Sequence, residues 1–358
     1  MSSLSSPKVC VLMSVFNGQE YLPEAIESIL QQTYADYEFV VIDDGSADGT
    51  AEILEGYAAR DRRICVHHHE NRGRAASLNI GMELTKCSYI ARMDADDIAL
   101  RNRLEDQVEF MEKHPEVGLL GGGVELMSSR GKVLATYRPS LLEDGEIRDV
   151  MMHRNTFYHP AVMMRKEVAI AAGGYRKALL DADDYDLWLR MGERSQFANV
   201  SQTIVKYRIH GNQVSVRNMR QQTLCVLAAQ AAARERRRGR SDPLSQVEKV
   251  TPETLEALGV TVEEVGKTLW RVYMEWMEFL PEQQPEAALG VIDGIVEVFG
   301  AGIGDRPSAA NALLAAAAIH YRQGRPLSAL ASAGRAVMIR PIIAGRPIKR
   351  AWVRLVRS

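Results

Sequence analysis

Short apolar runs alternate with helix-forming segments along the N-terminal part of the chain, and no other feature limits the fold as strongly. The apolar runs predict strands at residues 8–17, 38–42, 63–69 and 88–93. Helices are predicted between them at 20–32 and 75–85. This order with short connections predicts an α/β fold, Rossmann-like, in which helices cover both faces of a mostly parallel sheet. Ligands of such a fold bind at the carboxyl ends of the strands.

Three carboxylates, those of Asp94, Asp96 and Asp97, directly follow the strand predicted at 88–93. Like charges this close repel one another unless a cation shares them, and hard oxygen ligands suit Mg²⁺ or Mn²⁺ rather than zinc. An ion held there could bind phosphate. The alternative is a solvated acidic turn that caps the helix beginning near Arg101.

A second acidic turn begins at Asp43 and Asp44, after the strand predicted at 38–42. Its Asp and Ser side chains can also cap the helix that follows. Because both strands belong to the predicted parallel sheet, both turns should lie at the same edge of that sheet.

Several stretches of the chain together resemble the inverting glycosyltransferases of the GT-A fold, specifically the large family 2. The resemblance covers residues 8 to about 215 and leaves the remainder of the chain outside. The matching stretches are 11–17, 21–34, 41–46, 71–73, 77–81, 92–97, 159–162, 183–190 and 207–210.

The resemblance implies a nucleotide-sugar donor and a divalent cofactor, Mn²⁺ or Mg²⁺. It implies that Asp43 reads the base and that Asp94 lies nearer the ribose. Asp96 would hold the ion and the diphosphate, and His210 would complete the metal shell. The nucleotide-binding residues carried over are Ser14, Val15, Asn17, Glu20, Asp43, Asp44, Arg74, Asn79 and Asp94.

The resemblance also assigns catalysis to Asp184, which matches the carboxylate that acts as general base. Family members usually carry Glu immediately before it, whereas this chain has Asp183, so the choice within the pair stays open. Transfer with inversion needs a base on one face of the anomeric carbon and charge neutralisation of the diphosphate on the other. The alternative is a helix start whose acids favour the dipole. The residues implied for the sugars are His159, Trp188 and Asp97.

Three other motifs are interpreted as structural. Neighbouring side chains of His67, His68 and His69 would point to opposite faces of a strand, so a polar strand end is expected rather than a metal site. The glycine-rich segment 300–304 lacks the spacing of a phosphate loop and predicts a loop that ends a helix. The three glycines at 121–123 predict a bend or bulge.

The composition predicts a cytoplasmic enzyme with one large domain and a smaller one. The chain has 358 residues, 46% of them apolar, and a formal charge of −2, which argues against a broad basic surface for nucleic acid. The four cysteines lack metal spacing and are expected to be reduced core residues. Residues 1–7 do not form a signal peptide, and the run 312–319 is shorter than the roughly 20 residues that span a bilayer.

Beyond residue 215 the pattern becomes helical. Segment 313–341 weakly resembles a tetratricopeptide-type hairpin, the alternative being a helical lid that packs on the catalytic domain. Helices are predicted at 219–240, 251–258, 262–279, 285–299 and 309–322. The predicted organisation is a flexible N-terminus 1–7, a GT-A catalytic domain 8–218, a helical region 219–340 and a basic tail 341–358.

The basic tail combines cations with apolar residues and contains no acidic residue. Such a segment can lie on an anionic membrane, here the inner face of the plasma membrane. The alternative is that its arginines are solvated or pair with the acidic catalytic domain. Pro341 and Pro347 would leave only a short final helix.

Together these features predict a metal-dependent inverting glycosyltransferase that moves one sugar from a nucleotide-diphosphate sugar, a UDP-sugar, to a hydroxyl of a glycan or lipid-linked acceptor in bacterial cell-surface polysaccharide synthesis. The processive members' Gln-x-x-Arg-Trp motif and membrane helices are missing, so single transfer is expected. A sugar nucleotidyltransferase would need a basic glycine-rich loop after the first strand, which 14–18 does not supply. The other rival is a noncatalytic nucleotide-sugar-binding scaffold whose helical tail binds partners.

Overall fold

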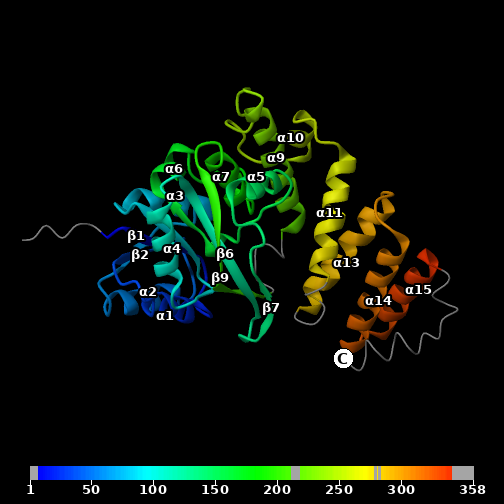
Figure 1. Cartoon of the computed structure of the whole chain (residues 1–358). Helices are drawn as coiled ribbons and strands as arrows, with labels where there is room; N and C mark the ends of the chain where they lie inside the picture. Colours follow the sequence, from blue (N-terminus) through cyan, green and yellow to red (C-terminus); the bar gives the residue numbers. More distant parts are fainter. Residues whose placement is uncertain (1–6, 211–217, 278–279, 281–283, 341–358) are drawn as a thin grey trace, which may run out of the picture. The chain divides into compact units, whose positions relative to one another are not determined.

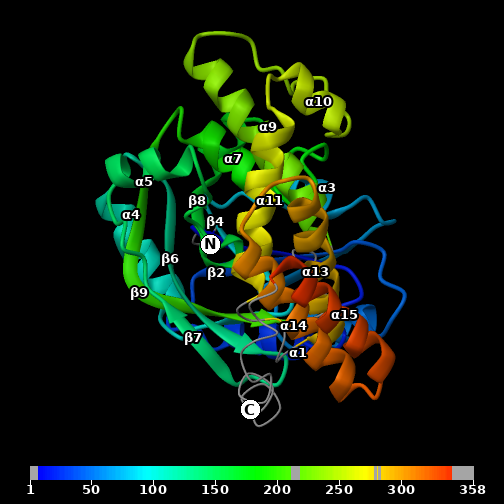
Figure 2. The same ribbon diagram turned by 90° about the vertical axis from the view of Figure 1, so that its right-hand side faces the viewer.

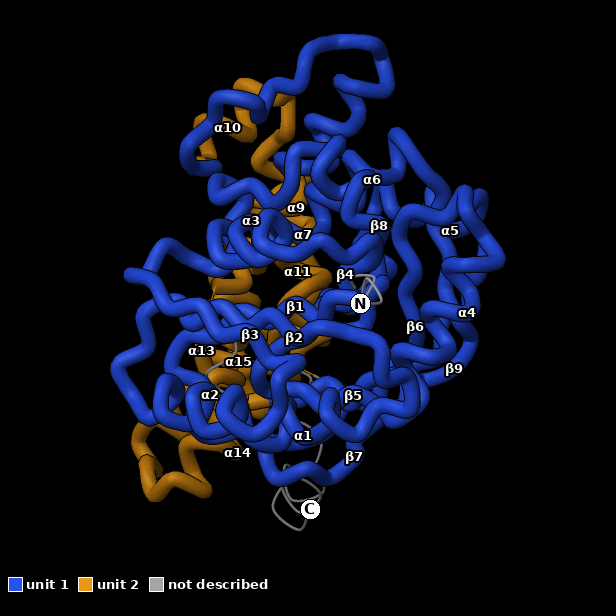
Figure 3. Tube along the Cα trace, turned by 90° about the vertical axis from the view of Figure 1, so that its left-hand side faces the viewer, with its two compact units in different colours: residues 1–209, 228–250 blue, residues 210–227, 251–358 orange. Residues whose placement is uncertain are grey.

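The computed structural model describes residues 7–210, 218–277, 280 and 284–340 (Figure 1). The chain forms two compact units, residues 1–209 with 228–250 and residues 210–227 with 251–358 (Figure 3). The division predicted after residue 218 precedes helix α9, Met219–Arg237, whereas the two units divide within that helix. The predicted basic tail lies outside the described residues.

The first unit is built on a nine-stranded sheet in the order β3-β2-β1-β4-β8-β6-β9-β5, with β7 paired to β6. The first four strands are parallel, β8 runs antiparallel to β4 and β6, and β9 is parallel to β6. The strands are β1 Val9–Val15, β2 Tyr37–Asp43, β3 Ile64–His68, β4 Tyr89–Asp94, β5 Ile98–Ala99, β6 Val117–Ser128, β7 Val133–Tyr137, β8 Met163–Arg165 and β9 Gln196–Ile209.

Helices enclose this sheet. Five consecutive residues of β1, Val9–Met13, are fully buried, and because successive side chains point to opposite faces, both faces of the strand are covered. The predicted α/β class is therefore confirmed. The helices are α1 Leu22–Leu30, α2 Thr50–Ala58, α3 Arg74–Leu84, α4 Arg103–Lys113, α5 Asp144–Met151, α6 Lys166–Ala171 and α7 Asp183–Met191, with a 3-10 turn, η1, at His159–Ala161.

The parallel register brings the acidic turns to one edge. Val15 at the end of β1 pairs with Asp43 of β2, and Ser14 pairs with Asp94 of β4. The carboxyl ends of these three strands are therefore level, and the turns that follow them are neighbours.

The glycine motifs are structural, as the sequence indicates. The register between β6 and β9 shifts between Gly121 and Gly123, which confirms the irregularity expected there. Helix α13, Pro285–Gly300, ends at the first glycine of the second motif, and Gly302 and Gly304 continue with positive φ angles.

The cysteine prediction is wrong at one position. All four cysteines are free and three are buried, but Cys65 is exposed. It lies on β3, the strand at one end of the sheet order, where one face of the strand meets solvent.

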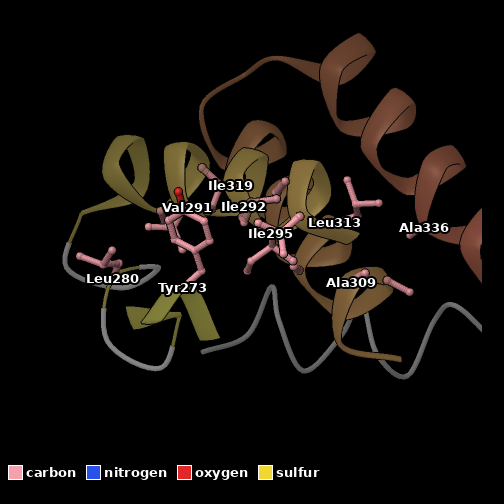
Figure 4. Close-up of a cluster of buried hydrophobic side chains, with 14 of the residues drawn as sticks. Tyr273, Leu280, Val291, Ile292, Ile295, Ala309, Leu313, Ile319 and Ala336 are labelled. Atoms are coloured by element: carbon pink, nitrogen blue, oxygen red, sulfur yellow. The ribbon is translucent and has the colours of Figure 1, made fainter. Parts of the chain in front are cut away.

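The second unit is a set of helices that pack in sequence order, α11 Val262–Trp276 on α13, α13 on α14 and α14 on α15 (Figure 2). Its core includes Leu269, Ile295, Leu313 and Ala336 (Figure 4). Helices α14 Arg306–Arg322 and α15 Pro326–Ile339 form a hairpin, and its likeness to a tetratricopeptide repeat stays a prediction. Helix α10, Pro252–Ala257, also lies in this unit. None of the helices in the described part of the chain is both long and apolar enough to cross a membrane.

Candidate active site

The loops after β1 and β2 are joined by side chain to backbone hydrogen bonds. The Asn17 amide N–H donates to Ser46 Oγ at 2.9 Å, and Asn17 Oδ1 accepts from the Ala47 N–H at 2.8 Å. The Gly18 N–H donates to Thr50 Oγ1 at 2.9 Å. Asn17 has a left-handed φ of 51°, a conformation that asparagine tolerates better than most residues. The two loops therefore form one rigid rim at the edge of the sheet.

Three further predicted nucleotide residues lie on this rim or beside it. Ser14 is half-buried and Val15 is buried at the end of β1, while Glu20 is exposed beyond the loop. The structure thus brings these residues together with Asn17 and Asp43 at the carboxyl end of β1 and β2.

Asp43 is buried and held from two sides. Its Oδ1 accepts from the Ser46 N–H at 3.0 Å, and its Oδ2 lies 2.8 Å from His68 Nδ1. The other ring nitrogen of His68 lies 3.0 Å from Glu55 Oε1 on α2. The hydrogen bonds to Glu55 and Asp43 raise the pKa of His68. A protonated His68 donates to both carboxylates and fixes the orientation of Asp43.

His68 was missed as a site residue by the sequence analysis, which expected a polar strand end. The signal lies in the strand pairing, because Asp43 and His68 are direct partners in the parallel register of β2 and β3.

Asp44 holds the loop that leads into α3. Its two carboxylate oxygens accept from the backbone N–H groups of Arg72 at 2.8 Å and Gly73 at 3.0 Å. Gly73 has a φ of 87°, which places it in the left-handed region that glycine adopts without strain. Asp44 thus positions the start of α3 and its first residue, Arg74.

Two buried arginines lie behind the carboxylates that follow β4. Arg92 forms an ion pair with Asp94 and is fully buried, whereas the Asp94 side chain is partly exposed. The Arg103 guanidinium donates to the Arg92 carbonyl at 2.6 Å. Burial, followed by the positive charge of Arg92, lowers the pKa of Arg103 to about 9. Burial raises the pKa of Asp94 overall, because it outweighs the positive charge of Arg92, which lowers that pKa.

A third arginine, Arg208 on β9, organises the same turn from another strand. Its backbone N–H donates to Asp97 Oδ1 at 2.7 Å, and its Nε donates to the Asp96 carbonyl at 2.7 Å. Its guanidinium also donates to Glu24 Oε2 at 2.6 Å and lies 4.5 Å from the centroid of the Tyr21 ring. Asp97 is buried, so the structure gives it a place under the turn rather than a surface for a sugar.

The turn suits a hard cation. Burial and the charges of Asp96 and Asp94 raise the pKa of Asp97 well above its usual range, and Asp97 Oδ2 is buried with no hydrogen-bond partner among the described residues. No three His, Cys, Asp or Glu side chains within those residues form a metal cage. Mg²⁺ keeps several waters and is often held by one or two carboxylates with substrate phosphates, so the residues fit such an ion.

His210 is the other residue predicted for the metal shell. It directly follows β9 and is the first residue of the second compact unit. Its place in the shell stays a prediction.

The two acids at the start of α7 have different environments. Asp183 is buried and forms an ion pair with Arg74, whereas Asp184 is partly exposed. Burial and the charge of Asp183 raise the pKa of Asp184 to about 7, while Arg74 lowers it. Asp94 also acts on the pKa of Asp184, which makes the turn after β4 and the start of α7 parts of one site.

An aromatic cluster supports this site from the interior. His159 Nε2 lies 3.0 Å from the Tyr175 hydroxyl, and the His159 and Trp188 rings are 5.9 Å apart. Burial, with the charges of Arg92 and Arg74, lowers the pKa of His159 well below its usual value, so the ring is neutral. Trp188 is fully buried, so it packs in the cluster and offers no surface to a sugar.

Asn79 serves the same cluster rather than a solvent-facing pocket. Its side-chain amide donates to the Tyr175 carbonyl at 2.8 Å and accepts from the Tyr175 N–H at 2.8 Å. Tyr175, which the sequence analysis did not single out, therefore joins three predicted site residues: Asn79, His159 and Trp188.

Comparison with known proteins agrees with this geometry. The model of the family described as Glycosyl transferase family 2 matches residues 10–173. EpsE of Bacillus subtilis (strain 168), which carries a glycosyltransferase name provisionally, is 37% identical over 209 residues, which are 57% of this chain and 74% of EpsE. The O-antigen biosynthesis glycosyltransferase WbnJ of Escherichia coli is 32% identical over 206 residues, covering 56% of this chain and 80% of WbnJ.

The amylovoran biosynthesis glycosyltransferase AmsE of Erwinia amylovora is 35% identical over 214 residues, covering 58% of this chain and 78% of AmsE. Among solved structures, residues 1–349 of Staphylococcus aureus TarS superpose with a TM-score of 0.51 at 14% identity, covering 90% of this chain and 88% of that one. The fold is that of a GT-A glycosyltransferase. The chain belongs to glycosyltransferase family 2.

Proposed function

We propose that this glycosyltransferase transfers a single sugar, with inversion, from a UDP-sugar to a hydroxyl of a glycan or lipid-linked acceptor. The observation that carries the proposal is the split at the start of α7, where Asp183 is bound to Arg74 and Asp184 is partly exposed with a pKa of about 7. A general base works best when its pKa lies near the working pH.

Asp184 is the base in this proposal. In its ionised form it takes the proton of the acceptor hydroxyl as that oxygen forms a bond to the anomeric carbon. The bond from that carbon to the diphosphate oxygen breaks on the opposite face, so the configuration inverts and no covalent intermediate forms. Asp183 stays bound to Arg74, which keeps its carboxylate close to Asp184.

The residues proposed to hold a divalent ion are Asp96 and His210, with Mn²⁺ or Mg²⁺ as the cofactor. Such an ion neutralises charge on the departing diphosphate. Asp94 binds the ribose, and Arg92 orients its carboxylate through their ion pair. Asp97 holds the turn to β9 through the Arg208 N–H at 2.7 Å.

The nucleotide base is proposed to bind at the joined loops after β1 and β2. Asp43, oriented by His68 and the Ser46 N–H, accepts from the base, while Ser14, Val15, Asn17 and Glu20 line the pocket. Staphylococcus aureus TarS, which shares the fold, has been solved with UDP and with UDP-GlcNAc. UDP-sugars are therefore the first donors to test.

The pathway proposed is the synthesis of a bacterial surface polysaccharide on the cytoplasmic side of the membrane. WbnJ and AmsE support it through their names, which refer to O-antigen and amylovoran biosynthesis. The domain division 8–218, 219–340 and 341–358 and peripheral contact of the basic tail with the inner face of the plasma membrane are part of the same proposal.

The test combines donor binding with turnover. A panel of nucleotide sugars with Mn²⁺ is screened for protection of the full chain against thermal unfolding, because a ligand that binds only the folded state must stabilise it. Donor hydrolysis is then measured for the wild type and for Asp184→Asn. Protection by a UDP-sugar with hydrolysis that Asp184→Asn abolishes supports the proposal. Protection without hydrolysis in either protein would favour the noncatalytic scaffold, and protection by no UDP-sugar would overturn the donor assignment.

A further inference from the structure

The last described helix, α15, carries apolar residues on a side that faces solvent. Leu327, Leu330 and Met338 are 81%, 70% and 74% exposed. With Ala331 and Gly334 they follow helical spacing, so they form one stripe, which we name the outer face of α15.

The opposite side of α15 is already covered. Ala329 and Ala336 are buried, and Ala336 belongs to the core of the second unit. Contiguous apolar side chains that stay exposed on a helix mark an interaction surface. Along the order α11, α13, α14 and α15 each helix packs on the next, and the outer face of α15 is what remains at the end of that order. The outer face therefore requires an occupant.

The charge around the outer face of α15 indicates what kind of partner would bind there. Asp305 is the last acidic residue of the sequence, so α14, α15 and everything beyond them contain only basic charges. Arg335 is exposed on α15, and Arg325 is exposed at its start. The contact of Arg325 with Glu286 is long, 3.6 Å, and exposed, so it contributes little to neutralising this charge.

The chain itself could cover the outer face of α15 in two ways, and both are electrostatically unfavourable. The segment after α15 brings further cations and no anion; its basic residues are Arg346, Lys349, Arg350, Arg354 and Arg357. A second copy docked through the same face would bring its own Arg325 and Arg335 against those of the first. Both arrangements place like charges together, whereas an anionic partner neutralises them.

The shape of the surface favours lipid over an acidic protein. The three large side chains are mostly exposed on one helix, as in helices that lie in the interfacial region of a membrane. Basic residues at the edge of such a stripe attract anionic headgroups. We propose that the outer face of α15 binds an anionic lipid surface, with Leu327, Leu330 and Met338 inserted among the lipids and Arg325 and Arg335 at the headgroups.

This proposal goes beyond the transfer reaction, because it rests on described residues of the second unit and on none of the site. It also gives the membrane contact a second element besides the basic tail. Because vesicle binding and donor hydrolysis are measured separately, failure of one proposal is distinguishable from failure of the other.

The experiment is cosedimentation of the full chain with vesicles of phosphatidylglycerol and phosphatidylcholine, and with vesicles of phosphatidylcholine alone. The wild type should sediment with the anionic vesicles at low salt and be released as salt rises. The variant Leu327→Asp/Leu330→Asp should lower the binding constant by about tenfold or more, since it removes two inserted side chains and adds two negative charges. A variant with Arg350→Gln, Arg354→Gln and Arg357→Gln removes charge from the basic tail and measures how much the tail contributes to vesicle binding.

Val262→Asp is the matched control. Val262 is 87% exposed at the start of α11, in the same unit but away from the stripe in sequence, and the change should leave vesicle binding unaltered. Donor hydrolysis and the thermal midpoint of each variant show that it is folded. Equal vesicle binding by wild type and Leu327→Asp/Leu330→Asp would overturn the proposal. So would a wild type that forms dimers which this variant loses, with no dependence on anionic lipid, because the occupant would then be a second copy.

Discussion

Two pairs of adjacent aspartates, Asp43–Asp44 and Asp183–Asp184, lie on different elements and share a division of labour. In the first pair Asp44 accepts two backbone N–H groups and holds a loop, while Asp43 is oriented by His68. In the second pair Asp183 is bound to Arg74, while Asp184 stays partly exposed. In each pair one acid holds a neighbouring loop or arginine, and the other is the one proposed to act on a ligand. The neighbours decide which acid does which, since the residue types are identical.

The two pairs also differ in a way that suits their proposed tasks. Both carboxylate oxygens of Asp43 are held by neighbours, namely the Ser46 N–H and His68. Asp184 has a buried acid beside it, and burial and that charge raise its pKa to about 7. A carboxylate in a fixed orientation suits recognition of a base, whereas an acid whose pKa is near neutrality suits proton transfer.

The largest expected effect comes from the Asp183–Asp184 pair. Asp184→Asn keeps the shape but cannot accept a proton, so the transfer rate should fall by about 10²-fold or more while donor affinity stays nearly unchanged. Steady-state rates and donor titration of the full chain measure the two quantities. A greater loss of turnover in Asp183→Asn would reverse the assignment and break the comparison.

A third acidic turn extends the comparison. In the turn after β4, Asp97 is held by the Arg208 N–H, and Asp96 is proposed to bind the ion. Asp96→Ala should abolish the metal dependence of nucleotide binding with little loss of stability, because it removes one of several repelling charges. His210→Ala should cause a smaller loss, because water can replace one ligand. Titration calorimetry with Mn²⁺ tests both variants, and full activity in excess chelator would rule out the metal.

The pH dependence of the transfer rate tests the coupling between Asp183 and Asp184. Because the base must be ionised and its pKa is raised to about 7, the transfer rate should rise with pH through about 7 and then level off. Asp183→Asn removes the charge that raises this pKa, so the acid limb of its profile should move to lower pH. Rates at saturating donor give the profile, and an unmoved limb in Asp183→Asn would contradict the coupling.

The smallest expected effect on activity concerns the Asp43–Asp44 pair. His68→Gln leaves Asp43 in place but weakens its orientation, so the donor KM should rise by about three- to tenfold with the maximal rate retained. His67→Gln is the control, because His67 neighbours His68 on β3 but pairs with Ile42 rather than with Asp43. An equal rise in both variants would show a general disturbance of the strand.

His68 also gives the direction of a stability change with pH. Its pKa is raised above the ordinary value of 6.5, so its contribution to folding is fully present below about 6.5 and is lost as pH rises through the folded pKa. The effect should be small, because the side chain is partly exposed. Thermal unfolding of wild type and His68→Gln from pH 5 to about pH 8 should converge at the alkaline end.

The sequence predicts the central strands and their acidic turns well, because both depend on local patterns. Long apolar runs form β1, β2 and β4, and the helix predicted at 285–299 is observed as α13, Pro285–Gly300. Short strands escape such prediction, since β5 has two residues and β8 has three, too few for a periodic pattern.

The division of roles within the site could not be predicted, because it depends on residues far apart in the chain. Arg208 reaches Asp97 across 111 positions, and Asn79 reaches Tyr175 across 96. Trp188 lies in a motif that implies contact with sugar, yet its neighbours His159 and Tyr175 bury it. Only the folded sheet determines which polar side chain faces the ligand and which supports it.

The buried ion pair beneath the β4 turn has a consequence for how the protein would acquire the proposed ion. The charge of Arg92 is covalently part of the chain and is paired with Asp94, so folding does not wait for a metal. Loading and stripping of the ion should then be reversible events on an intact protein. In the proposed metal-dependent reaction, a shortage of the ion would leave an idle but undamaged protein, which resumes work as soon as the supply returns.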